Sequence, residues 1–192
     1  MKRSKFPEPI PYETERFTMR PMKTLPLAWR TYHWTKQAAD LFQYLGWKTK
    51  GWSLYRWYRH IRKLNRPHVH CHTIISKETG ELIGLFITYM DKQANGFGQQ
   101  TILLGEQLWR GKGVHLETYA ASLDYCFDYL NLHKLRGFLA ADNRVSLKNN
   151  LAIGFVQEAN LREEWLLPNG ERTDKIMIGM FREEWQQKKK GL

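Results

Sequence analysis

Four consecutive residues in the second half of the sequence could hold a phosphate group. They are Arg110, Gly111, Lys112 and Gly113, and they lie between a β-patterned run and a long amphipathic segment. Glycines let the backbone come close to a ligand, and amide N–H groups at a helix start point outward, so this turn predicts a pyrophosphate cradle. The spacing lacks the third glycine of a dinucleotide fingerprint and the Gly-Lys-Ser/Thr ending of a nucleotide P-loop. A tight turn that serves only packing is the alternative.

A second group of polar residues follows further along the chain. Asp142, Asn143 and Ser146 stand close together, and Gly154 with Phe155 begins eight residues after Ser146. Ser and Asn at the start of a helix often act only as N-caps. The pattern therefore leaves open whether Asn143 and Ser146 cap a helix or contact a ligand.

Three histidines could supply a base or bind a metal. His68, His70 and His72 fall on one face of a β-patterned run, because side chains alternate along a strand. No carboxylate or cysteine completes a metal site at a known spacing, and Cys71 points to the other face, so we expect no metal. His70 and His72 remain alternative bases or proton carriers.

A mixed sheet with helices on it must position these residues. Hydrophobic periodicity and turn signals predict one α/β domain over residues 1–192, with about seven strands. The expected strands are 14–22, 69–76, 82–90, 98–104 running on to about 107, 135–140, a run from residue 155, and 175–181. The expected helices are 36–45, 53–64, 114–130 and 145–152. Within the domain we expect a basic helical region at about 24–65, a cofactor-binding core at about 97–156, and a basic, solvated tail at 186–192.

The chain is strongly basic, and the charge is unevenly placed. Its formal net charge is +11, and residues 1–65 carry 14 Lys and Arg against four acidic residues. Such a field favours anionic partners, among them a phosphorylated cofactor, an acidic substrate or RNA, and it disfavours polycations. A basic surface that is merely solvated is the alternative.

Composition also bears on the compartment. No run approaches the ~20 apolar residues that a membrane span needs, and the N-terminus has no apolar signal core. Cys71 and Cys126 lie far apart in the sequence, so we expect reduced thiols. We therefore expect a cytoplasmic protein with no membrane partner, as a monomer or a homodimer.

Together, the two clusters resemble the GNAT N-acetyltransferase superfamily. The likeness is closest to the branch that contains the ribosomal-protein alanine and serine acetyltransferases. The early Arg20-Pro21, Trp34-Thr35 and Tyr44 to Trp47 also fit this branch, so the resemblance covers nearly the whole domain. The features that carry it follow in the order Trp109 to Gly113, Asn143 and Ser146, Gly154-Phe155, Asn169-Gly170, Asp174, and Glu184-Trp185.

The resemblance implies a cosubstrate, acetyl-CoA, and an acceptor amine that attacks its thioester directly. It implies a mostly antiparallel sheet with a V-shaped opening between two central parallel strands. The pantetheine arm would lie along residues 100–107, and the pyrophosphate would sit on the amides of residues 110–114. Leu108 stands where the family usually has Gln or Arg, which weakens one side-chain contact. The implied cofactor contacts are Leu103 and Leu104 through the backbone, Leu108, Trp109, Arg110, Gly111, Lys112, Gly113, Val114, Asn143 and Ser146.

Direct attack requires a base, donors for the oxyanion, and an acid for the leaving thiolate. Glu106 is our first choice for the base because it lies close before the turn, on the strand that lines the cofactor. A solvated strand-end glutamate is the alternative. Ser146 matches a serine that assists the thiolate in the ribosomal-protein branch. Many GNAT enzymes use a tyrosine for the thiolate, and the matching residue here is Asn150.

The sequence does not identify the acceptor amine. The ribosomal-protein branch suggests the N-terminal α-amine of a protein, with the basic surface docking on a ribosome or an acidic protein. An amino sugar nucleotide or another small amine is an alternative, since its phosphates would suit Arg56, Arg59 and Arg62. Polyamines and aminoglycosides fit less well because residues 25–65 hold one carboxylate, Asp40. The competing class is a non-catalytic, basic binding module on the same fold.

Overall fold

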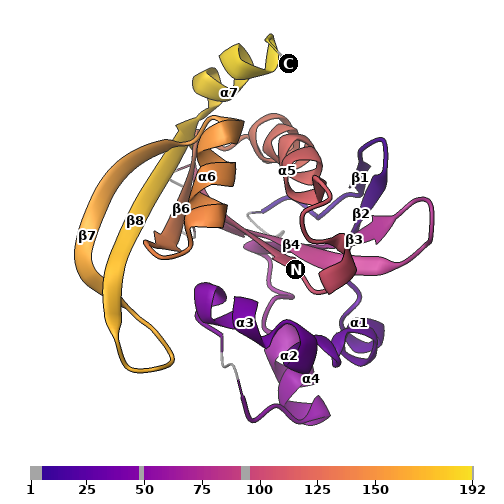
Figure 1. Ribbon diagram of the computed structural model, residues 1–192. Coiled ribbons are helices and arrows are strands. Elements are labelled where there is room, and N and C mark those ends of the chain that lie inside the picture. The colour runs from indigo at the N-terminus through magenta and orange to yellow at the C-terminus, as the bar shows by residue number, and fades with distance from the viewer. Residues whose placement is uncertain (1–5, 48–49, 92–95, 192) are drawn as a thin grey trace.

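A mixed sheet forms the centre of the protein in a computed structural model that describes residues 6–47, 50–91 and 96–191 (Figure 1). Within these residues the sheet has eight strands in the order β1-β2-β3-β4-β5-β6-β8-β7. They are β1 (Tyr12–Glu13), β2 (Phe17–Pro21), β3 (Val69–Ser76), β4 (Leu82–Met90), β5 (Phe97–Leu104), β6 (Lys134–Ala140), β7 (Val156–Leu166) and β8 (Arg172–Phe181).

Helices cover both faces of the sheet. One face packs against the N-terminal helices, through a core that contains Trp34, Trp57 and Leu103. The other face packs against the long central helix and the C-terminal half of the chain, through a core that contains Phe86 and Phe127. The helical segments of the described chain are α1 (Thr24–Thr31), α2 (Trp34–Gln37), α3 (Ala39–Phe42), η1 (Gln43–Leu45), α4 (Leu54–Arg62), η2 (Gln107–Trp109), α5 (Val114–Asp124), η3 (Tyr125–Tyr129), α6 (Arg144–Ile153) and α7 (Arg182–Lys189).

The predicted α/β class is confirmed, with one strand more than expected. β1 has two residues, which is too short for a period-two pattern to register. β3 and β4 have the predicted bounds. None of the helices in the described ranges is long and apolar enough to cross a membrane.

Two predicted helices are interrupted in the structure. The segment 36–45 is broken at Ala38, whose φ of −116° and ψ of 19° lie outside the helical range, so it forms α2, α3 and η1. The segment 114–130 is helical as far as Tyr129, but it changes from α to π geometry at Tyr125. Periodicity predicts that a segment is helical and does not report such local changes in winding.

The predicted end of one strand was wrong. β5 stops at Leu104, and the chain then turns through η2 instead of continuing as a strand to residue 107. In the predicted basic tail, residues 186–191 are exposed, and α7 continues through the tail to Lys189. Trp185 anchors α7 by donating to Asp124 Oδ1 at 2.9 Å, and Lys189 forms an ion pair with the same carboxylate.

The sheet opens between its two parallel strands. β5 and β6 pair only where residues 97–99 face residues 134–136. Both strands then continue, β5 to Leu104 and β6 to Ala140, without further pairing to each other. The remaining strand pairs are antiparallel. The predicted V-shaped opening is therefore present on the carboxyl side of this short parallel contact.

Candidate active site

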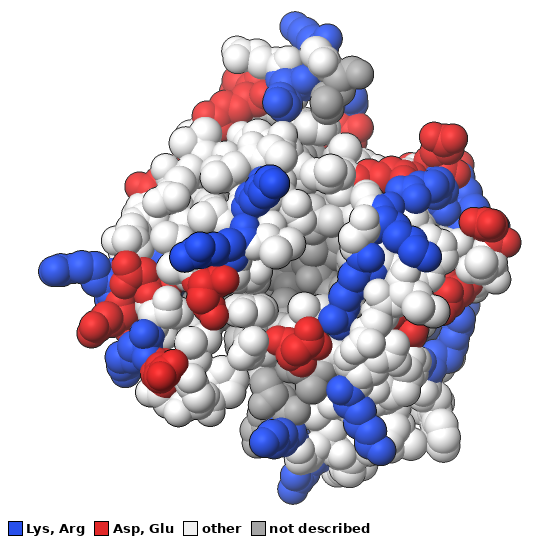
Figure 2. All heavy atoms as spheres, in the orientation of Figure 1, with Lys and Arg blue, Asp and Glu red and all other residues white. Residues whose placement is uncertain are grey.

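A cavity of about 610 Å³ occupies the opening between β5 and β6. Its walls come from the second half of β5, the turn after β5, the start of α5, the end of β6, α6, and the segment α3–η1. In the space-filling view the same face is hollowed near its centre, with Lys and Arg side chains on both sides of the hollow (Figure 2). The cavity thus lies where two predicted features meet, the glycine-containing turn and the polar segment at residues 142–146.

The turn after β5 has the geometry of a cradle. Gly111 and Gly113 have φ values of +77° and +74°, in the left-handed region that favours glycine. A Cβ atom at Gly111 would meet no atom within 4 Å, so the cavity wall is open beside it. Val114 then begins α5, whose first N–H groups have no partner within the helix.

An ion pair holds this turn against the start of the chain. Arg16 Nε donates to Glu117 Oε2 at 2.6 Å, and Arg16 Nη2 donates to the carbonyl oxygen of Lys112 at 3.1 Å. Burial raises the pKa of Glu117, but hydrogen bonds from Thr14 and Arg16 outweigh this, and the pKa is lowered overall. Glu117 is therefore ionised at neutral pH and fixes the turn through Arg16.

Several buried polar atoms in the cavity wall lack a partner. Arg110 pairs through Nη1 with Asp40 at 3.1 Å, while its Nε and Nη2 atoms are buried without a hydrogen bond. Nδ1 of His115 and Oε1 of Gln100 are also buried without a hydrogen bond. Buried polar atoms without a partner are costly, so these atoms suit a ligand that supplies the missing bonds. The N–H groups on these two guanidinium nitrogens fit a phosphate oxygen.

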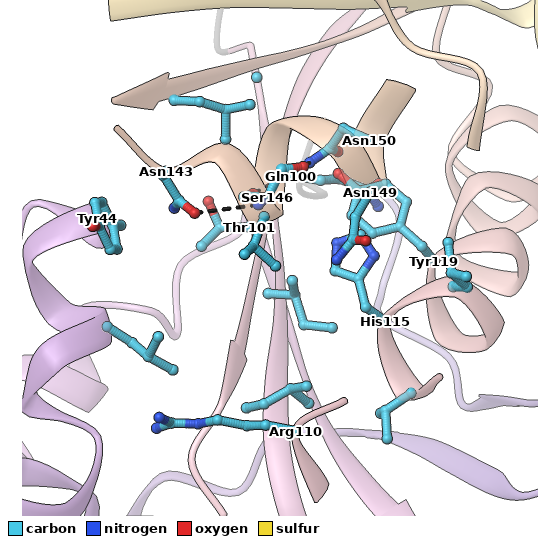
Figure 3. A pocket seen from close by; sticks show the side chains of 18 of the residues that line it. Tyr44, Gln100, Thr101, Arg110, His115, Tyr119, Asn143, Ser146, Asn149 and Asn150 are labelled. Carbon is cyan, nitrogen blue, oxygen red and sulfur yellow. Dashed lines mark hydrogen bonds between the residues drawn. The ribbon is translucent and has the colours of Figure 1, made fainter. Parts of the chain in front are cut away.

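His115 is neutral in this wall. Burial lowers its pKa to about 4. Its ring lies beside Tyr119 on α5 and faces α6 across the cavity (Figure 3). A neutral imidazole can accept or donate one hydrogen bond there without adding charge.

The start of α6 carries a chain of hydrogen bonds. Asn143 Oδ1 accepts from the Ser146 N–H at 3.2 Å, which makes Asn143 the N-cap of the helix (Figure 3). Asn150 Nδ2 donates to the Ser146 carbonyl at 2.8 Å and to Ser146 Oγ at 3.4 Å. Because Ser146 Oγ accepts from Asn150, the serine hydroxyl can direct its own proton elsewhere. Ser146 and Asn150 both line the cavity.

The backbone of β5 alternates between β4 and the opening. Gly105 N–H donates to the Ile83 carbonyl at 3.0 Å, on the β4 side. By the alternation of an antiparallel ladder, the Leu103 backbone also faces β4, whereas those of Ile102 and Leu104 face the opening. The side chain of Leu103 is fully buried in the core against the N-terminal helices. Leu104 therefore contacts the cavity and Leu103 does not.

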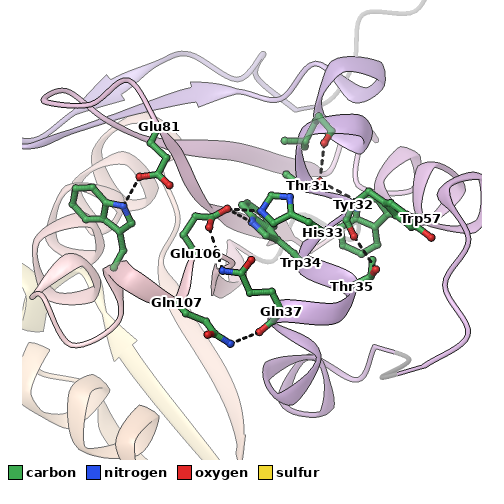
Figure 4. Close-up of polar contacts among 12 residues, drawn as sticks. Thr31, Tyr32, His33, Trp34, Thr35, Gln37, Trp57, Glu81, Glu106 and Gln107 are labelled. Carbon is green, nitrogen blue, oxygen red and sulfur yellow. Dashed lines mark hydrogen bonds and ion pairs between the residues drawn. The ribbon is translucent and has the colours of Figure 1, made fainter.

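Glu106 lies outside the cavity lining, in a network with α2 (Figure 4). Its Oε1 accepts from Trp34 Nε1 and from His33 Nε2, each at 2.6 Å, and its Oε2 accepts from Gln37 at 3.3 Å. Burial raises the pKa of Glu106, but these hydrogen bonds outweigh it and lower the pKa overall. The geometry favours a role in anchoring α2 to the end of β5. The assignment of the base to Glu106 stays a prediction.

Replacement of Glu106 by glutamine is expected to lower stability in a pH-dependent way. The folded-state pKa lies below the ordinary value of 4.5, so the carboxylate's contribution is present above about pH 4.5 and is lost as the pH falls through the folded pKa. We expect Glu106→Gln to cost about 2 kcal/mol at pH 7 and less at pH 3.5, as measured by urea unfolding. Glu183→Gln, on the exposed first turn of α7, is the matched control.

A different result would assign Glu106 the role of general base. A loss of about 100-fold in kcat, with unchanged unfolding free energy at both pH values, is what removal of a general base would give.

The histidines predicted as alternative bases lie away from the cavity. His70 contacts the Tyr125 hydroxyl at 2.7 Å and the Pro7 carbonyl at 2.9 Å, and His72 contacts the Ile10 carbonyl at 3.0 Å. Burial lowers the pKa of His72 to about 4. Neither histidine lines the cavity, so both hold the N-terminal segment on β3. Among the described residues, no group of three potential ligands is placed to hold a metal ion.

The structure brings together most of the predicted site residues. Leu103, Glu106, Leu108 and Lys112 do not line the cavity, and Leu108 is 79% exposed. Sequence reasoning assigned no role to His115, Tyr44 or Asp142, although Tyr44 and Asp142 stood within quoted motifs. The predicted residues that do line the cavity are Leu104, Trp109, Arg110, Gly111, Gly113, Val114, Asn143, Ser146 and Asn150.

A sheet splayed between two parallel strands, with a glycine-containing turn at its opening, is the arrangement that the sequence resemblance implied. The sequence model of the acetyltransferase (GNAT) domain matches residues 16–156. The chain belongs to the GNAT acetyltransferase family.

Curated relatives agree with this family. An uncharacterised N-acetyltransferase p20 of Bacillus licheniformis is 32% identical over 113 residues, which are 59% of this chain and 62% of that protein. The spermidine N(1)-acetyltransferase of Vibrio cholerae is 30% identical over 128 residues, which are 62% of this chain and 70% of that protein. The alignment thus spans less than two thirds of the first relative's length.

Solved structures show the same fold. The V. cholerae spermidine N-acetyltransferase, solved with CoA and spermine, has a TM-score of 0.78 at 21% identity and covers 89% of this chain and 98% of its own. The ribosomal-protein-S5-alanine acetyltransferase of Vibrio fischeri has a TM-score of 0.76 at 19% identity, with 92% and 99% covered. The predicted family, the GNAT acetyltransferases, is confirmed as the family of this chain. The ribosomal-protein branch stays a prediction.

Proposed function

We propose that this protein transfers an acetyl group from acetyl-CoA to a primary amine by direct attack, with the N-terminal α-amine of a protein as the first candidate acceptor. One observation carries the proposal. The cavity between β5 and β6 combines an open glycine turn with buried guanidinium N–H groups of Arg110 that have no partner. Such groups suit a ligand that carries phosphates at the cavity mouth.

The residues present fit the cosubstrate. The amides of residues 110–114 and the free N–H groups of Arg110 would hold the pyrophosphate. The backbones of Ile102 and Leu104 face the opening, so they would hold the pantetheine arm and supply an oxyanion donor. Acetyl-CoA brings the acetyl group as a reactive thioester.

Ser146 is the residue we assign to the leaving thiolate. Its Oγ accepts from Asn150 Nδ2 at 3.4 Å, and this leaves the hydroxyl proton free to point into the cavity. Asn150 is buried, with 4% of its surface exposed, so it positions the serine. The pair would replace the tyrosine that many GNAT enzymes use.

The acceptor proposal rests on charge. The helical region at residues 24–65 is basic, which suits docking on an acidic protein or on a ribosome in the cytoplasm. The carboxylates that would hold a polyamine are scarce there, because Asp40 is the one acidic residue of this segment and pairs with Arg110. A mono-cationic amine therefore fits better than spermidine.

Two measurements test the proposal in sequence. Acetyl-CoA should raise the thermal unfolding midpoint, because a ligand held by the native state stabilises it by mass action. Release of CoA thiol should then follow with at least one of three amines: alaninamide, glucosamine 6-phosphate and spermidine. We expect alaninamide to react fastest. No midpoint shift at millimolar acetyl-CoA would reject the proposal.

Removal of the Ser146 hydroxyl is expected to slow the reaction without weakening cofactor binding. We expect Ser146→Ala to lower kcat about 30-fold, within the range that one proton-transfer group contributes. The acetyl-CoA midpoint shift should stay as in the wild type. The matched serine control is Ser53→Ala, at the N-cap of α4. Ser4 does not serve as a control because it lies outside the described residues. An unchanged kcat for Ser146→Ala would show that the serine does not protonate the leaving thiolate.

A further inference from the structure

The cavity contains a single negative charge. Among the described residues that line it, Asp142 is the one carboxylate, and Arg110 is the one Lys or Arg. The acetyl acceptor must bring an amine, which is cationic in water before it reacts. The placement of this one carboxylate therefore bears directly on where the acceptor binds.

The backbone around Asp142 is held from several sides. Asp142 follows β6, and the Ala141 N–H donates to the Asp174 carbonyl at 2.9 Å. The Asn143 N–H donates to the Ala140 carbonyl at 2.9 Å, and the Arg144 N–H donates to the Asp142 carbonyl at 2.8 Å. Because Asn143 also caps α6, the carboxylate stands at a fixed position at the carboxyl end of β6.

Tyr44, which lines the cavity from η1 (Figure 3), reaches Asp142. Its hydroxyl donates to Asp142 Oδ2 at 3.3 Å, and it belongs to η1 of the basic N-terminal region. Burial, followed by the charge of Asp142, raises the pKa of Tyr44, so the phenol stays protonated and remains a donor. Oδ1 of Asp142 accepts no hydrogen bond from a residue in the described part of the chain, so it can receive a ligand.

Glu106 and Asp40 do not compete for this role. Glu106 lies outside the cavity lining and accepts from three side chains. Asp40 also lies outside the lining and pairs with Arg110. Both carboxylates are thus already matched with donors.

From this geometry we infer that Asp142, oriented by the Tyr44 hydroxyl, binds the ammonium group of the acceptor and selects acceptors with one positive charge. The inference rests on the proposed function. An ammonium donates three hydrogen bonds, and one carboxylate oxygen with the cavity polar groups can accept them. For a second or third ammonium, the described lining offers no further carboxylate and contains the cation Arg110.

The test measures steady-state constants for the amine that the wild type acetylates fastest among alaninamide, glucosamine 6-phosphate and spermidine. Asp142→Asn should raise the KM for this amine at least tenfold and leave the KM for acetyl-CoA and its midpoint shift as in the wild type. Asp142→Glu keeps the charge and should recover part of the loss. Tyr44→Phe removes only the orienting bond and should raise the amine KM about threefold. Asp128→Asn, on an exposed residue outside the cavity lining, is the matched control.

The outcomes separate the two proposals. If the wild type acetylates one amine and Asp142→Asn keeps the wild-type KM for it, the Asp142 inference fails and the proposed function stands. A rise in the KM for acetyl-CoA alone would assign the carboxylate to the cofactor and also overturn the inference. If the wild type acetylates none of the three amines, the proposed function fails and the inference fails with it. A preference for spermidine over alaninamide would overturn the selection of singly charged acceptors.

Discussion

Gly111→Val is expected to weaken acetyl-CoA binding at least 100-fold. Gly111 has a φ of +77° in the turn after β5, a conformation that costs a β-branched residue about 1–2 kcal/mol. No atom lies within 4 Å of the position where its Cβ would stand, so a valine side chain would project into open space beside the cradle. A loss of 100-fold in affinity corresponds to about 2.7 kcal/mol. The measurement is the shift of the unfolding midpoint over a range of acetyl-CoA concentrations.

A matched control separates backbone strain from loss of the cradle. Gly80, in the turn between β3 and β4, has a φ of +69° and also has no atom within 4 Å of its Cβ position. Gly80→Val should therefore lose similar stability without ligand and keep the full acetyl-CoA shift. If both variants keep the shift, the pyrophosphate does not lie on this turn.

Gly105→Ala is expected to destabilise the whole domain. A Cβ at Gly105 would overlap Cδ2 and Cε2 of Trp34, a fully buried side chain. The indole cannot move away freely, because its Nε1 donates to Glu106 and its ring is packed in the core with α1 and α4. We expect a loss of about 3 kcal/mol in the free energy of unfolding, in the upper range for overpacking. The midpoint temperature of thermal unfolding should fall by about 10 °C.

A double substitution tests the proposed contact. Trp34→Leu costs stability by itself, but it makes room for the alanine methyl group. In the Trp34→Leu background, Gly105→Ala should cost less than it does in the wild type, and this non-additivity isolates the contact. Equal costs in both backgrounds would mean that the alanine is accommodated by a backbone shift.

Local pattern was sufficient for much of the fold. β3 and β4 have the predicted bounds because they are β-patterned runs on either side of a turn-rich segment, and α4 lies within the predicted helix 53–64. The two glycines of the cradle and the cap of α6 were also readable, since positive φ and helix capping are requirements of the local backbone. The break at Ala38 was not readable, because no proline or glycine marks it.

The sequence by itself determined the family and predicted the cradle and the cofactor, because each motif consists of residues that are close together along the chain. Only the tertiary structure decided which carboxylate faces the cavity. Hydrogen bonds hold the Glu106 carboxylate outside the cavity lining, and its partners lie in α2 and just before it, 69 to 73 residues away. Asp142 is oriented by Tyr44, which is 98 residues away. Hydrogen bonds between distant segments leave no local periodicity, and the pKa and direction of a carboxylate depend on such bonds.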